Sequence, residues 1–134
     1  MLFCLINKNI IFKTIDSIIK EEKGFYCIGI LFPHTEEINK QTNIICNCLD
    51  NNKNIEYPSL QVFDNKLNKI GFTYKNKRFL IYVVTLDRFI TMRQPSYDVV
   101  FFPDGNYPEY YKHYALIMMR RVDSKEKEER LIYY

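Results

Sequence analysis

Cys27, His34, Cys46 and Cys48 have side chains of the types that bind zinc, and all four lie in the first half of the chain. Zinc-binding segments usually supply their ligands in pairs that lie about two to four residues apart. Cys46 and Cys48 are separated by one residue in a segment with a helical pattern, where two such side chains diverge by about 200°. We therefore predict that these cysteines pack as small apolar side chains, and we expect no bound metal and no other cofactor.

Enzymatic chemistry has few candidate residues in this sequence. His34 and His113 are the only histidines that could serve as the base for a nucleophile. The sequence contains no G-x-S-x-G segment, no H-E-x-x-H segment and no glycine-rich phosphate loop. The acid pairs Glu21–Glu22 and Glu36–Glu37 lie on predicted helices, where such pairs are typical of a solvated face. We predict a protein that is not an enzyme. The alternative is a small enzyme acting on a phosphorylated substrate, with His113 as the base and arginines as the phosphate clamp.

The densest polar-aromatic segment runs from Tyr107 to Tyr114, in a predicted loop. Its aromatic rings could stack on nucleic-acid bases while its cations contact phosphate. The alternative is that the rings cover the edge of a sheet as secondary core, with each hydroxyl reaching water. The candidate binding residues of this segment are Tyr110, Tyr111, Lys112 and His113.

Arginines are the second set of candidate binding residues, because their planar side chains make bidentate contacts with phosphate. All the arginines of the chain lie at or after Arg78. The alternative is a set of ordinary surface salt bridges with the acidic tail that contains Glu126, Glu128 and Glu129. The candidates for phosphate contact are Arg88, Arg93, Arg120 and Arg121.

Charge is distributed unevenly along the chain, although the net charge of +3 is small. Residues 1–65 carry a net charge of −2, residues 66–121 carry +6 and residues 122–134 carry −1. An excess of cations in one segment favours a polyanionic partner. We expect the cations between Lys66 and Arg121 to gather on one exterior face.

The composition is typical of a globular domain, with 47% hydrophobic residues in 134. This content excludes a disordered chain, and no run of about 18 apolar residues predicts a membrane-spanning helix. Scattered cysteines and the absence of a secretory signal pattern favour a reducing, cytoplasmic location. We expect one domain over residues 1–134, with no membrane partner and no small-molecule substrate.

The spacing of apolar residues predicts two helices in the first half of the chain, over residues 10–22 and from Thr35 to Asp50. Short apolar runs bounded by turn residues predict strands over residues 2–6, 25–32, 60–63, 69–74, 78–86, 97–102 and 114–122. A helical turn is predicted over residues 88–94, and residues 123–130 form a charged tail. These elements predict an α+β fold with two N-terminal helices packed on a largely antiparallel sheet of five to seven strands.

The chain is short and rich in Ile, Lys and Asn, and in composition and size it resembles the ribosome dormancy (hibernation) factors of microsporidian-type parasites. This resemblance implies a non-enzymatic factor that docks on an idle ribosome and blocks translation sterically. Its partners would be rRNA phosphates and ribosomal proteins. A protein embedded in rRNA carries far more positive charge than +3, which favours docking on the surface of a nucleoprotein. The alternative is an adaptor or host-interaction module that binds only protein.

Overall fold

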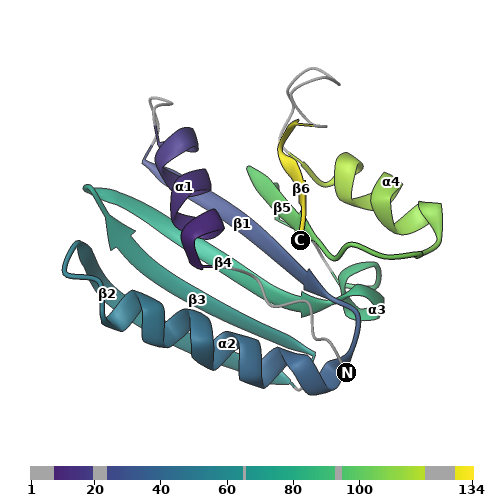
Figure 1. Cartoon of the computed structure of the whole chain (residues 1–134), viewed down its shortest axis with the longest axis horizontal. Helices are drawn as coiled ribbons and strands as arrows, with labels where there is room; N and C mark the ends of the chain where they lie inside the picture. The colour runs from purple at the N-terminus through teal and green to yellow at the C-terminus, as the bar shows by residue number, and fades with distance from the viewer. Residues whose placement is uncertain (1–7, 20–23, 65, 93–94, 120–128) are drawn as a thin grey trace.

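The computed structural model describes residues 8–19, 24–64, 66–92, 95–119 and 129–134 (Figure 1). The strand predicted over residues 2–6 lies outside the described residues, as do Arg93, Arg120, Arg121 and most of the charged tail. The described chain forms four helices and a single sheet of six strands. The predicted α+β class and the expected number of strands are therefore confirmed.

The strands of the sheet lie in the order β2-β3-β4-β1-β5-β6. Their bounds are β1 (Phe25–Phe32), β2 (Ile55–Asp64), β3 (Leu67–Tyr74), β4 (Lys77–Thr85), β5 (Val99–Phe102) and β6 (Leu131–Tyr133). The neighbours β4 and β1, β1 and β5, and β5 and β6 run parallel, whereas β3 is antiparallel to both β2 and β4. The sheet is mixed, so the expected largely antiparallel sheet is wrong.

Helices cover both faces of this sheet. Their bounds are α1 (Lys8–Ile18), α2 (Thr35–Asp50), α3 (Leu86–Phe89) and α4 (Glu109–Ile117). Residues of α1 and α2 pack with one set of strand side chains, and residues of α3 and α4 pack with the opposite set. The expectation that both packing helices are N-terminal is wrong, because two further helices cover the second face.

The strand predicted over residues 114–122 is wrong, because residues 109–117 form α4. The segment from Tyr114 to Met119 is a short apolar run, and such a run does not by itself distinguish a buried strand from a buried helix. In the structure Tyr111, Tyr114 and Ala115 pack inward, at the spacing of one helix face. Ile117 points outward and is 66% exposed.

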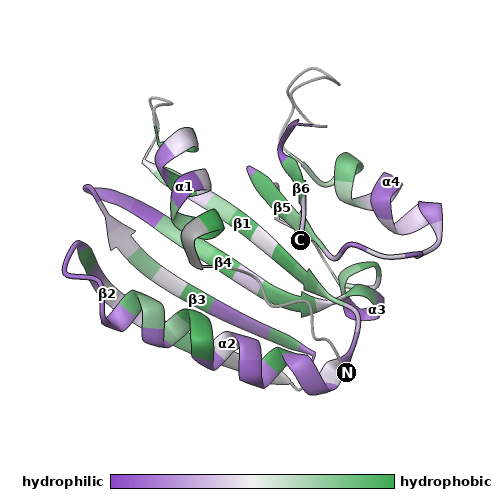
Figure 2. Ribbon diagram, viewed as in Figure 1, coloured by the Kyte–Doolittle hydropathy of each residue, from purple (hydrophilic) through white to green (hydrophobic). Residues whose placement is uncertain are grey.

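The central strand β1 is buried on both faces, which explains its nearly unbroken apolar sequence (Figure 2). Ile28 and Ile30 face α1 and α2, whereas Cys27 and Leu31 face α3 and α4. Parallel strands need a long crossover, and the 16-residue helix α2 begins the connection from β1 to its parallel neighbour β4.

One edge of the sheet is formed by β2, whose pairing with β3 is irregular. The register shifts between Glu56 and Ser59, on either side of the exposed Pro58, and again between Val62 and Asp64. Proline has no N–H to donate to a ladder, so it is tolerated on an edge strand or at a bulge.

Gly29 in β1 allows the ring of Tyr97 to lie directly against the strand backbone. A Cβ atom at Gly29 would lie 3.0 Å from Cε1 of Tyr97 and 3.2 Å from its Cδ1. Tyr97 is fully buried, and its ring also contacts the rings of Tyr82 and Phe89, so it has little room to move.

We predict that Gly29→Ala lowers the free energy of unfolding by about 1–3 kcal/mol, because the added methyl group overpacks this contact. Urea denaturation of the two proteins would measure the difference. Gly24→Ala is the matched control, since a Cβ atom there meets nothing within 4 Å. Equal losses in the two variants would contradict this account of Gly29.

Candidate functional site

The parallel strands β1, β4 and β5 end at the same edge of the sheet, at Phe32, Thr85 and Phe102; we call this the carboxyl edge. In open sheets with helices on both faces, ligands bind outside the carboxyl ends of the strands, where successive connections leave toward opposite faces. Here β1 continues into α2 on one face and β5 leads to α4 on the other. We therefore expect a ligand-binding site at the carboxyl edge.

Tyr134 lies across the carboxyl edge between β1 and β5. Its hydroxyl donates a hydrogen bond to the carbonyl of Leu31, and its ring packs edge-on against Phe32, with the centroids 5.8 Å apart. Its backbone N–H donates to the carbonyl of Phe102 at 3.1 Å, and the N–H of Asp104 donates to its carbonyl at 2.7 Å. Tyr134 therefore covers this part of the edge.

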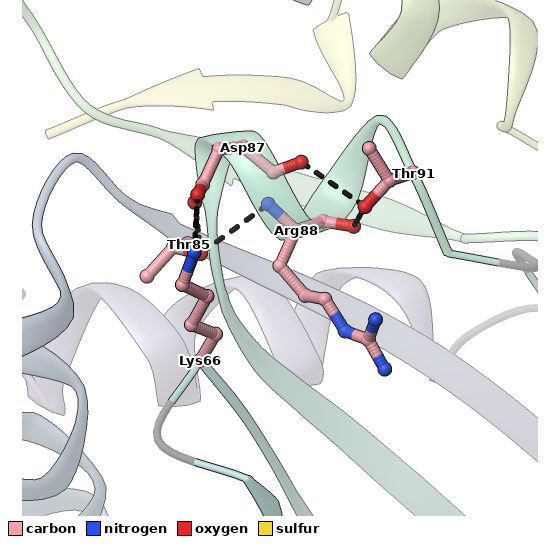
Figure 3. A network of polar contacts seen from close by, with 5 residues as sticks. All are labelled: Lys66, Thr85, Asp87, Arg88 and Thr91. Atoms are coloured by element: carbon pink, nitrogen blue, oxygen red, sulfur yellow. Dashed lines mark hydrogen bonds and ion pairs between the residues drawn. The ribbon is translucent and has the colours of Figure 1, made fainter.

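A network of polar contacts holds the start of α3 at the end of β4 (Figure 3). Thr85 is 1% exposed, and its hydroxyl accepts a hydrogen bond from the backbone N–H of Arg88 at 3.3 Å. The same hydroxyl donates to Oδ1 of Asp87 at 2.5 Å, and Nζ of Lys66 lies 2.7 Å from Oδ2 of Asp87. The hydrogen bond from Lys66, followed by that from Thr85, lowers the pKa of Asp87.

This network positions Arg88. Asp87 is held by Lys66 and Thr85, and the guanidinium of Arg88 points away from that carboxylate (Figure 3). Thr91 closes the short helix by donating to the carbonyl oxygens of Asp87 and Arg88 at 3.3 and 3.1 Å. Arg88 therefore lies on a fixed turn at the carboxyl edge.

We predict that Thr85→Val lowers the free energy of unfolding by about 1–2 kcal/mol, because it removes the helix cap and leaves a partly buried N–H without its acceptor. Hydrogen exchange at the amide of Arg88 should become faster. Thr91→Val is the control, because this exposed hydroxyl lies at the solvated end of α3, and it should change stability by less than about 0.5 kcal/mol. A loss for Thr91→Val as large as that for Thr85→Val would contradict the capping role.

The predicted Tyr-rich loop is mostly helical, because α4 includes Tyr110, Tyr111, Lys112 and His113. Tyr111 is half-buried against the core, as the alternative interpretation of secondary core expects. Tyr110 is 54% exposed, His113 is exposed and Lys112 is half-buried. The rings of Tyr110 and Tyr111 lie 4.4 Å apart.

Helices α3 and α4 are neighbours at the carboxyl edge. The ring of Phe89 in α3 packs edge-on against Tyr114 in α4, with the centroids 5.4 Å apart. The pKa of Tyr111 is raised, chiefly by its hydrogen bond with Tyr110 and in smaller part by the charge of Asp87. The fold thus makes neighbours of two helices that lie about twenty positions apart in sequence and that carry candidate residues. We define the α3–α4 surface as Arg88, Tyr110, Lys112, His113 and Ile117.

The described cations between residues 66 and 119 do not gather on a single face. Lys66, Arg88 and Lys112 lie toward the carboxyl edge, whereas Lys75, Lys77 and Arg78 lie at the hairpin between β3 and β4, beside the start of β1. Lys75 lies 3.4 Å from Asp16, and the ammonium groups of Lys69 and Lys77 lie over the rings of Tyr82 and Tyr26. Only part of the positive charge is therefore available to a partner at the carboxyl edge.

The cysteines and histidines are spread over the described structure. Cys27 is buried in β1, while Cys46 and Cys48 are partly exposed on α2, where burial raises the pKa of Cys46. Within the described ranges, no group of three or more His, Cys, Asp or Glu side chains is placed to hold a metal ion. None of the helices in these ranges is long and apolar enough to cross a membrane.

A buried polar group on the inner face of α2 is not predicted from the sequence. Glu37 is 6% exposed, so its expected place on a solvated face is wrong, although Glu36 is exposed as expected. Gln41 and Thr42 are also buried, and Nδ2 of Asn68 in β3 donates to Oγ1 of Thr42 at 3.0 Å. The helical spacing in the sequence nevertheless indicates this burial, because these positions share one face of the helix with Ile38 and Ile45.

We predict that Glu37→Gln raises the free energy of unfolding near pH 7. Burial raises the pKa of Glu37 above 4.5, so the folded protein binds this proton more tightly than the unfolded chain does. Stability is therefore greatest below that value and falls as the pH rises through the raised pKa. Urea denaturation should show a gain for the Gln variant that grows from about pH 4 to about pH 7. Glu36→Gln is the control, and a gain that does not depend on pH would contradict this account.

The geometry alone supports the assignment of a site, because the comparisons point to no relative. Searches of protein-family models, curated proteins and solved structures find no significant match to this chain. The contacts that bring α3 and α4 together at the carboxyl edge are therefore the basis for a functional proposal.

Proposed function

We propose that this protein is a non-enzymatic factor that docks on the surface of a nucleoprotein, with the ribosome as the first partner to test. The observation that carries the proposal is the α3–α4 surface. It combines cationic side chains with exposed aromatic and aliphatic ones on two neighbouring helices. A nucleoprotein presents both phosphate and protein to a docking partner. The cationic side chains of this surface suit the phosphate, and the aromatic and aliphatic side chains suit the protein.

The cationic part of the surface suits contact with phosphate. Arg88 supplies a planar guanidinium on a short, capped turn, and such side chains bind phosphate in a bidentate manner. Lys112 and His113 on α4 add further donors. The exposed ring of Tyr110 could stack on an unpaired base.

The apolar part suits contact with protein. Tyr110 and Ile117 are 54% and 66% exposed, and with His113 they follow one outer face of α4. Exposed aromatic and aliphatic side chains on one helix face are typical of protein-binding sites. This observation also favours the second candidate, an adaptor that binds only protein.

Nearby carboxylates limit the strength of the electrostatic contribution. Asp87 is paired with Lys66, and Glu109 begins α4 beside Tyr110. We therefore expect a small number of phosphate contacts and a modest dependence of binding on salt. A compact domain that blocks its partner sterically needs no more than a small number of phosphate contacts, because contact with protein also contributes to its affinity.

We predict that the double variant Arg88→Glu with Lys112→Glu weakens co-sedimentation with purified ribosomes. Each lost phosphate contact should lower the slope of log affinity against log salt by about one. The matched control is Lys53→Glu with Arg78→Glu, which changes the net charge equally. Both control residues are exposed, at the end of the sheet where β1 begins.

Three outcomes of this experiment are informative. Loss of binding in the Arg88 and Lys112 variant, with binding retained in the control, supports docking through the α3–α4 surface. Equal behaviour of the two variants contradicts it. Binding that resists salt and both charge reversals, but is lost in Ile117→Asp, would replace the nucleoprotein proposal with the protein-only adaptor.

A further inference from the structure

A cavity of about 380 Å³ lies between α1 and the amino ends of β5 and β6, on the opposite face of the sheet from α3 and α4. Small-molecule sites in proteins have volumes of about 300–1,000 Å³, so this cavity can hold a compact ligand. Its apolar lining comes from Ile18, Val99 and Ile132. Neither the α3–α4 surface nor the proposed docking function involves it.

The polar lining of the cavity carries both signs of charge. Lys13 projects from α1, and Glu129 and Arg130 come from the segment just before β6. Within the described ranges, neither Lys13 nor Glu129 forms an ion pair. Their two opposite charges therefore lie at the same cavity and are not paired with each other. A ligand that carries both signs could contact both.

The other polar groups that line the cavity favour a ligand whose cationic group lies near α1. The hydroxyl of Thr14 donates to the carbonyl of Ile10 at 2.8 Å, so its oxygen is left as an acceptor for a ligand. Helix α1 ends at Ile18, and the last carbonyl groups of a helix carry partial negative charge. Ser17 adds another hydroxyl to the lining. A dianion such as phosphate would be opposed by Glu129 and by this helix end.

We propose that this cavity binds a small zwitterion, an α-amino acid with an apolar side chain. Its carboxylate would contact the ammonium group of Lys13, and the positive charge of Arg130 lines the same cavity. Its ammonium group would contact the carboxylate of Glu129 and the hydroxyl oxygens of Thr14 and Ser17. Its side chain would pack on the apolar lining.

The test compares three ligands of similar shape in an NMR titration of the labelled full chain. L-leucine carries both charged groups, isopentylamine lacks the carboxylate and 4-methylpentanoate lacks the ammonium group. We expect L-leucine to bind at least about tenfold more tightly than either comparator, since each loses a charge-assisted hydrogen bond. Amide shifts should occur at residues 13–18 and 129–132 and be absent from α4.

Variants of the two exposed charges test the roles of the residues. Lys13→Gln and Glu129→Gln should each weaken binding of L-leucine about tenfold, whereas Glu129→Gln should not weaken binding of 4-methylpentanoate. Lys53→Gln, on the loop before β2, is the control and should leave binding unchanged. If L-leucine binds no better than its comparators, or if inorganic phosphate binds and L-leucine does not, the proposal is overturned. Ser17→Leu, which fills the cavity, should abolish the shifts; their persistence would also overturn it.

Discussion

The burial of β1 between two parallel partners is the constraint on which the rest of the structure depends. Every residue of β1 from Tyr26 to Phe32 is buried, and the strand pairs with β4 along its whole length and with the start of β5. The junction with β5 is held by Asp98, whose N–H donates to the carbonyl of Cys27 while its carboxylate accepts the N–H of Cys27 at 2.8 Å. A parallel strand in this position requires cover on both faces.

The position of the candidate site follows from this arrangement. The return from β1 to β4 places α2 on one face, and the connections from β4 and β5 place α3 and α4 on the other. Because these strands are parallel, the loops that lead to the helices begin at the same edge. Helices α3 and α4 thus become neighbours because of the topology, although the chain between them forms a loop and a complete strand.

Much of the fold could be predicted from local sequence patterns. The central strand over residues 25–32, the start of α2 at Thr35 and the turn after Tyr74 are confirmed. The direction of strand pairing could not be predicted, since it depends on which distant strands meet. The short apolar run in α4 was misassigned because a buried helix and a buried strand share that pattern.

Less of the candidate site could be predicted. Residue type alone identified Arg88 and the Tyr110–His113 segment as candidates, and the structure places them on the neighbouring helices α3 and α4. The capping role of Thr85, the ion pair of Asp87 with Lys66 and the cover that Tyr134 gives to the carboxyl edge depend on contacts between distant segments. The expected single cationic face is wrong, because Lys66 and Lys75 lie at opposite ends of the strand β3.

The irregular pairing of β2 has a consequence for how this molecule meets others. An exposed edge strand is normally a template on which a second chain can add a strand of its own. The interruptions on either side of Ser59, together with Pro58, break the regular row of donors and acceptors that such addition needs. Self-association by joining sheets is thereby discouraged at the β2 edge.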